Sequence, residues 1–159
     1  MEKQLLKIED RLEEMGLFLP DKPKPSGHYL GSVRADPFLF VSGVTCKWNG
    51  DLPYKGRVGV ELSLEEGYKA AKLTTLNQLA IVKDVLGCFS LIERVVKVTG
   101  YVSCEAGFPN VPKVINGASD LLVELFGENG KHARCAVGVS SLPGNAAVET
   151  DLILLLKKL

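Results

Sequence analysis

A run near the C-terminus, residues 133–149 with the sequence ARCAVGVSSLPGNAAVE, constrains the fold of this chain more than any other stretch. It predicts two strands joined through a Pro-Gly-Asn segment by a turn or a short crossover. Because side chains alternate along a strand, one face of the first strand carries Cys135, Val137 and Val139. Such an apolar face indicates a strand that is half-buried.

The opposite face of the same strand carries Arg134, followed by the very small side chains of Ala136 and Gly138. These small residues leave unfilled space beside the guanidinium of Arg134, which suits a pocket for an anionic ligand. A guanidinium presents a planar fork of donors that can hold a carboxylate through two hydrogen bonds. Glu149 begins the final strand, and its carboxylate is the right group to orient or deprotonate a water molecule.

An arginine and a glutamate on solvent-facing strands are also common where no site exists, so spacing alone leaves both interpretations open. If residues 142–145 formed a tight hairpin, Arg134 would lie several residues out of register with Glu149. Meeting around one ligand would then need another strand between them, or a second subunit.

The run ARCAVGVSSLP, followed by AVETD, resembles the C-terminal signature of the RidA family, also known as YjgF or L-PSP. In that family an arginine lies two positions before a cysteine or alanine and precedes a Leu-Pro turn. A Val-Glu or Ile-Glu strand then closes the chain. The similarity extends upstream to about Ser26 and divides the chain into two parts. These are an N-terminal helix with a proline-rich connector, residues 1–25, and a RidA-like domain, residues 26–159.

Length and charge limit the class of protein. A chain of 159 residues is enough for one domain with a substantial core, and 46% hydrophobic with 24% charged residues are ordinary globular values. Lysine plus arginine equals aspartate plus glutamate at 19 each, and no basic cluster stands out, so nucleic-acid binding is not expected. No apolar run reaches the length of a membrane span, so no membrane partner is expected.

Cysteine and histidine usage argues against a metal site. The four cysteines, at positions 46, 88, 104 and 135, form no Cys-x-x-Cys pair, and the chain has two histidines. The sequence following Met1 is acidic from its second position and lacks the apolar core of a secretory signal. We therefore expect a cytoplasmic protein with reduced thiols and with neither metal nor cofactor.

The N-terminal segment predicts a helix over residues 1–16 and an extended connector over residues 19–26. Apolar residues of the helix recur at helical spacing and form one stripe on a charged body. The stripe consists of Leu5, Ile8, Leu12 and Met15. We expect it to pack on the protein's own surface rather than to recruit a partner. Three prolines keep the connector out of any helix or central strand.

Residues 27–33 and 37–43 predict the two strands of a hairpin, with an Asp-Pro pair at its turn. The resemblance implies that three residues of this hairpin line a ligand pocket, as their counterparts do in the family. They are Tyr29, Ser42 and Gly43. A tyrosine packed on the core and a turn glycine with positive φ are the alternatives. In the following loop, residues 44–60, Trp48 and Tyr54 either shape substrate choice or anchor the loop.

The rest of the chain alternates between helix and strand. We expect a third strand around Gly59, a helix over 63–86, a strand over 93–103, a loop over 104–112 and a helix over 114–126. Ser63 and Glu66 form a capping box that begins the first of these helices. Asn116 lies near the start of the second, where the family often places an asparagine close to the pocket. N-capping explains it equally well.

This order predicts an α+β fold, a single domain in which a mixed six-stranded sheet carries two helices on one face, plus the N-terminal helix. The free face of the sheet would be exposed and apolar, which does not suit a monomer. The resemblance implies a chorismate-mutase-like fold that forms homotrimers, with three pockets in the clefts between subunits.

The resemblance also implies a chemistry: hydrolysis of reactive enamines or imines, chiefly 2-imino acids, to 2-keto acids and ammonia. In that picture Arg134 clamps the substrate carboxylate, Glu149 holds the water, and backbone groups near Gly43 and Ala136 bind the substrate. Ala136 stands where the family often has cysteine, which removes a thiol but keeps the backbone donor. A trimer that binds small carboxylates without turnover is the alternative. An endoribonuclease is disfavoured, because the chain has no charge surplus and no paired histidines.

Overall fold

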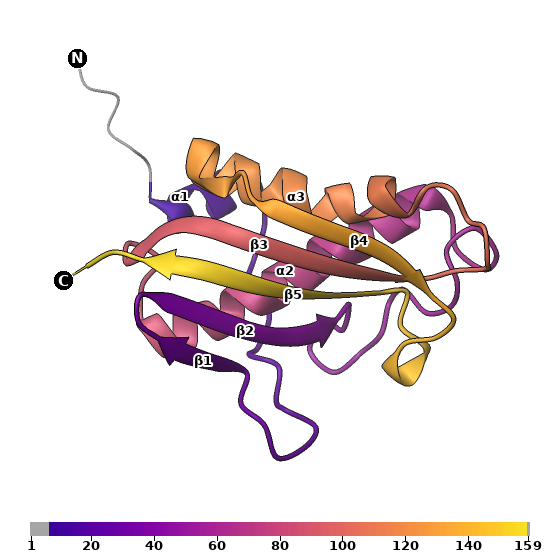
Figure 1. The fold of residues 1–159 in the computed structure, drawn as a ribbon, viewed down its shortest axis with the longest axis horizontal. Coiled ribbons are helices and arrows are strands. Elements are labelled where there is room, and N and C mark those ends of the chain that lie inside the picture. Colours follow the sequence, from indigo (N-terminus) through magenta and orange to yellow (C-terminus); the bar gives the residue numbers. More distant parts are fainter. Residues whose placement is uncertain (1–6, 159) are drawn as a thin grey trace.

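Five strands and three helices make up the computed structural model, which describes residues 7–158. The sheet has the order β1-β2-β5-β3-β4, and α2 and α3 cover one of its faces (Figure 1). The strands are β1 (Ser32–Ala35), β2 (Phe38–Thr45), β3 (Ile92–Ser103), β4 (Ala133–Val139) and β5 (Val148–Leu156). The helices are α1 (Ile8–Glu14), α2 (Leu64–Leu86) and α3 (Val111–Phe126). The predicted α+β class with helices on one face is confirmed.

The link between β4 and β5 is a crossover rather than a hairpin, because β3 lies between them in the sheet. β4 runs parallel to β3, whereas β5 is antiparallel to it. In register, Arg134 pairs with Val98 of β3 and Glu149 pairs with Tyr101 of the same strand. Of the two links that the sequence allowed, the structure therefore has the crossover, and β3 separates Arg134 from Glu149.

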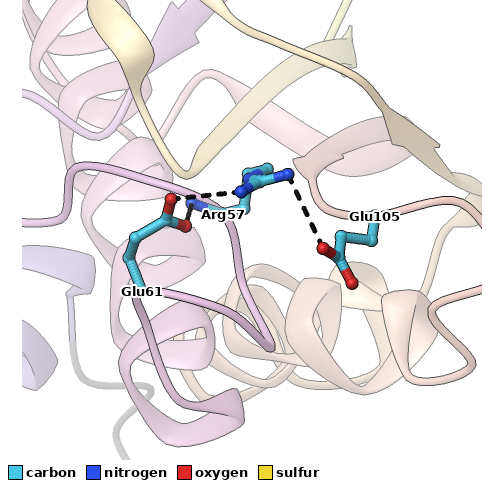
Figure 2. A network of polar contacts seen from close by, with 3 residues as sticks. All are labelled: Arg57, Glu61 and Glu105. Carbon is cyan, nitrogen blue, oxygen red and sulfur yellow. Dashed lines mark hydrogen bonds and ion pairs between the residues drawn. The ribbon is translucent and has the colours of Figure 1, made fainter.

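The sheet has five strands because the predicted strand around Gly59 is absent. Residues 57–62 form a tight turn instead, in which the Arg57 carbonyl accepts from the backbone amides of Val60, Glu61 and Leu62. The Arg57 guanidinium lies between two carboxylates, 3.4 Å from Glu61 and 3.7 Å from Glu105 (Figure 2). Hydrogen bonds within the segment thus pair its backbone groups locally. Its isolated β-bridges join Val58 to Leu62 and to Cys104.

Capping residues set the limits of the two long helices. Ser63 accepts from the Glu66 amide and Glu66 caps the Ser63 amide, so the predicted capping box begins α2. Gly87 ends this helix in the left-handed conformation. α3 begins at Val111 rather than at the predicted position 114, because a proline in the first turn loses no helical hydrogen bond.

The hairpin and the N-terminal helix differ from the prediction mainly in their limits. β1 begins at Ser32, not at 27, because pairing with β2 extends only from Ser32 to Ala35. In α1, Leu12 is buried in the same core as the sheet, and Ile8 and Met15 pack against that core. The expected packing of this stripe is confirmed for these residues, while Leu5 lies outside the described residues.

The two faces of the sheet differ sharply in burial. On β5 every second residue is buried beneath the helices, whereas the residues between them face the other side. The sequence predicted that residues 133–139 form a half-buried strand with Cys135, Val137 and Val139 on its apolar face. In β4 the partly buried side instead carries Arg134 and Ala136, and Cys135 and Val137 are exposed because no helix covers their side. Further exposed apolar side chains on the uncovered face belong to Val33, Phe38 and Phe40. No helix within residues 7–158 is long and apolar enough to cross a bilayer.

Candidate functional site

Glu149 lies on the uncovered face of the sheet, because its neighbours Val148 and Thr150 are buried on the helix side. It pairs with Thr45 of β2 and Tyr101 of β3. A shift of register in β2 between Val41 and Val44 brings Gly43 beside it. A Cβ placed on Gly43 would lie 3.5 Å from the Glu149 carboxyl carbon, at ordinary contact distance, so the Gly43 backbone lies directly beside the carboxylate.

A cavity of about 250 Å³ opens beside the Glu149 carboxylate. Its walls include Tyr29 and Gly43, two of the residues that the resemblance implied for a ligand pocket. Ser42 does not line this cavity. Its hydroxyl donates to the Leu30 carbonyl and thereby fixes the backbone next to Tyr29. The structure thus brings Tyr29, Gly43 and Glu149 together, with Ser42 as a support.

Hydrogen bonds hold the tyrosine at this cavity. The Ser26 amide donates to the Tyr29 hydroxyl at 3.2 Å, and the Ser26 hydroxyl lies at the same distance from it. These bonds lower the pKa of Tyr29. The ring is half exposed, so it forms a wall of the site rather than part of the core.

Burial raises the pKa of Glu149, and the negative charge of Asp151 raises it further. Asp151 lies two residues along β5 and therefore on the same face. The Tyr101 hydroxyl donates to the Asp151 carboxylate at 3.5 Å, and burial, followed by the charge of Asp151, raises the pKa of Tyr101. Sequence reasoning missed Tyr101 and Asp151, although the Glu-x-Asp spacing on a strand indicates two carboxylates on one face.

Arg134 projects to the other side of the sheet, toward α3. Its guanidinium donates to the Asn116 side-chain oxygen at 2.8 Å, to the Ser119 hydroxyl at 3.1 Å and to the Pro112 carbonyl at 3.4 Å. Asn116 lies inside α3, so the N-capping alternative for it is wrong. The structure places Asn116 and Arg134 together and leaves the guanidinium partly exposed.

His132 extends this arrangement by one further link. Its Nδ1 lies 2.6 Å from the Gly130 carbonyl, which can only accept, so Nδ1 carries the ring proton. Nε2 then accepts from the Ser119 hydroxyl at 2.9 Å, which leaves the Ser119 oxygen free to accept from Arg134. Burial lowers the pKa of His132, which favours this neutral ring. His132 and Ser119 thus help to fix the direction of the guanidinium.

Arg134 and Glu149 do not share a cavity within one chain. They lie on opposite faces of the sheet, separated by β3, and Arg134 does not line the cavity beside Glu149. Ala136 is on the Arg134 side, where it packs against a second core cluster with members from α2, α3, the sheet and the loops. The residues predicted from sequence therefore form two groups, one around Glu149 and one around Arg134.

The two aromatic side chains of the loop after β2 are anchors. Trp48 packs against the core beneath α2, and Tyr54 packs against the second cluster. Neither lines the cavity beside Glu149. Within residues 7–158, no group of three or more histidine, cysteine, aspartate or glutamate side chains is placed to hold a metal ion.

Comparison with known protein families shows to which family the chain belongs. Residues 9–156 match the family described as YjgF/chorismate mutase-like, putative endoribonuclease. The chain belongs to the YjgF/RidA family. Among curated YjgF/RidA relatives, Protein TCP17 of Trypanosoma cruzi is 36% identical over 148 residues, covering 92% of each chain. A RutC family protein of Aquifex aeolicus is 30% identical and covers 84% of this chain and 93% of its own.

Solved structures of YjgF/RidA proteins agree with the fold. The protein Atu1372 of Agrobacterium tumefaciens is 40% identical, with a TM-score of 0.88 over 94% of this chain and 92% of its own. A protein of Shewanella oneidensis, described as a putative endoribonuclease, is 33% identical with a TM-score of 0.92, over 95% and 100% of the two chains. RidA of a Psychrobacter species, at 24% identity and a TM-score of 0.58, shares the fold.

Proposed function

We propose that this YjgF/RidA protein hydrolyses reactive 2-imino acids, or their enamine tautomers, to 2-keto acids and ammonia. The observation that carries the proposal is the Glu149 carboxyl. It is half-buried, its pKa is raised, and it faces a cavity lined by the family-matched Tyr29 and Gly43. A raised pKa makes this carboxylate a better base near neutral pH than an exposed one.

The reaction needs little from the protein beyond a positioned water and a base. Glu149 takes a proton from water as the oxygen adds to the imine carbon, and it passes this proton to the nitrogen to give a neutral carbinolamine. Glu149 then takes the proton of the new hydroxyl group as the carbonyl forms and the carbon–nitrogen bond breaks. It gives this second proton to the leaving nitrogen, so ammonia departs and the carboxylate is regenerated. Holding water and imine together supplies much of the acceleration.

The substrate carboxylate would be held by Arg134 of a neighbouring copy, in a homotrimer. Two observations support this part of the proposal. Arg134 and Glu149 of one chain lie on opposite sides of the sheet, so a second copy is needed to unite them. Exposed Phe38, Phe40 and Val137 also form an uncovered apolar face, which association would bury.

Ammonia release from freshly generated 2-imino acids tests the proposal. Wild type should exceed the buffer rate, and Glu149→Gln should lose about two to four orders of magnitude, the usual effect of a positioned acid–base group. Because glutamine keeps the shape of the side chain, affinity for 2-oxobutyrate should change little. Equal ammonia release by both proteins would make Glu149 a structural residue.

Two further measurements on the same proteins address the two alternative functions. Calorimetric binding of 2-oxobutyrate without turnover of any imine would favour a carboxylate-binding module. Cleavage of a single-stranded RNA by wild type, lost in Glu149→Gln, would instead favour the endoribonuclease that the family description names.

A further inference from the structure

Two lysines line the cavity beside Glu149. Lys24 comes from the proline-rich connector, and Lys47 follows β2. Both are exposed, and neither forms an ion pair with a carboxylate within residues 7–158. The cavity is therefore lined by one glutamate and by two lysines that form no ion pair within the part of the chain that the structure describes.

The backbone that carries each lysine is fixed by side chains. Asn77, buried in α2, donates to the carbonyls of Thr45 and Lys47 at 3.1 and 2.6 Å. The connector is tied at Asp21, whose amide donates to the Asn49 side chain at 2.8 Å. A second tie is the ion pair from Lys22 to Asp84 of α2, at 2.7 Å. The backbone near each lysine is therefore held in place by these contacts.

The cavity continues beyond the lysines. A neighbouring cavity of about 370 Å³ is lined by Lys24, Lys47, Pro23 and Asn77, all of which also line the cavity beside Glu149. The two cavities adjoin at these shared residues and are together called the cleft. A ligand longer than a three- or four-carbon acid can extend from Glu149 to the lysines.

The lysines do not neutralise Glu149. Its pKa is raised by burial and by Asp151, and a nearby ammonium would have the opposite effect. The charge of Lys24 and Lys47 is therefore available to an anionic group of a ligand.

We propose that Lys24 and Lys47 form a subsite for a second anionic group, so that the preferred substrates are 2-imino dicarboxylic acids. This inference rests on the proposed function: the imine carbon lies at Glu149, Arg134 of a neighbouring copy holds the first carboxylate, and the lysines hold the distal one. An acidic side chain of the parent amino acid supplies that distal carboxylate. Neutral side chains leave both ammonium groups unpaired.

Calorimetry measures the subsite without turnover. Wild type should bind 2-oxoglutarate about five- to twenty-fold more tightly than 2-oxobutyrate, because partly exposed ion pairs are each worth up to about fivefold. The preference should disappear in the double variant Lys24→Gln/Lys47→Gln and weaken as salt is raised from about 50 to 500 mM. Lys69→Gln, which removes an exposed lysine from α2 outside the cleft, is the matched control and should keep the preference.

Equal preference in wild type and in the double variant would overturn the subsite, as would no detectable binding of either keto acid. Both lysines are exposed, so the variants should fold, and circular dichroism checks this.

Ammonia release separates failure of the subsite from failure of the proposed function. With 2-iminoglutarate and 2-iminobutyrate as substrates, the double variant should lose about five- to twenty-fold in kcat/KM for the first and change little for the second. If neither imine is hydrolysed but 2-oxoglutarate still binds preferentially through the lysines, the deaminase proposal fails and the subsite stands. If wild type and double variant hydrolyse both imines in the same ratio, the deaminase stands and the subsite is overturned.

Discussion

At the scale of single residues, the site is defined by two carboxylates on one strand face. Asp151 lies two residues from Glu149 and contributes to its raised pKa, while Tyr101 donates to Asp151 from β3. The other charged or titratable groups at Glu149 are Tyr29, Lys24 and Lys47 around the cavity. Burial raises the pKa of Glu149, and among the neighbouring charges that of Asp151 raises it further.

Asp151→Asn should therefore shift the acidic limb of the pH–rate profile to lower pH. Removing a neighbouring negative charge makes ionisation of Glu149 easier, so its pKa falls and the active carboxylate persists at more acidic pH. The midpoint of the limb, measured by ammonia release on one imine, reports this pKa. Asp120→Asn, on α3 outside the cavity beside Glu149, is the charge-matched control, because Asp120 also accepts from a tyrosine hydroxyl, that of Tyr68. An unmoved midpoint would contradict the role of Asp151.

At the scale of elements, the helix layer holds its position through one very close approach. At Gly117 of α3, a Cβ would lie 2.0 Å from the Tyr68 carbonyl of α2. The obstacle is backbone, so no side-chain rotation relieves it. This approach sets the distance between α2 and α3 and hence the place of Asn116 and Ser119 beneath Arg134.

Gly117→Ala should destabilise the protein by about 3 kcal/mol or more, because the two helices must move apart to accept the methyl group. Gly87→Ala makes the same chemical change at the left-handed end of α2, where nothing lies within 4 Å of the new Cβ. Only the conformational cost remains there, about 1–2 kcal/mol. Urea unfolding of the two variants measures the difference, and equal losses would argue against the tight helix contact.

Element limits also show what the sequence could predict. α2 was predictable to within a residue because Ser63, Glu66 and Gly87 are local capping signals. The strand around Gly59 was not, because a turn satisfied by Arg57 and Glu61 depends on contacts that strand propensity ignores. Tyr29, Gly43 and Glu149 were expected at one pocket, and the structure places them together. That β3 separates Arg134 from Glu149 is a fact of topology that spacing alone left open. That Arg134 faces the helices depends on which face of β4 the helices cover, which alternation along the strand does not decide.

At the scale of the whole molecule, the uncovered sheet face is the apolar surface that association with another chain would bury. Phe40 is 45% exposed there, and its cross-strand neighbour Val33 is 51% exposed. α2 and α3 cover the opposite face, as Figure 1 shows. A second copy of the chain is the partner that the YjgF/RidA resemblance implies.

Phe40→Lys should weaken association, because it places a charge in the apolar patch that assembly would bury. Sedimentation at micromolar concentration should find a trimer for wild type and smaller species for the variant. Phe18→Lys replaces a phenylalanine that is 73% exposed outside the sheet, and it should leave the assembly intact. A monomeric wild type would contradict both the trimer and the shared site.

The position of β3 between Arg134 and Glu149 has a genetic consequence. If each site draws its arginine from one copy and its glutamate from the next, two inactive alleles can complement each other. The test refolds equal amounts of Arg134→Ala and Glu149→Gln subunits together. About one quarter of all sites should then receive an intact arginine from one subunit and an intact glutamate from its neighbour. A protein with both residues in one pocket of one chain would recover no activity on mixing. The recovered activity therefore shows whether the two residues of a site come from different subunits.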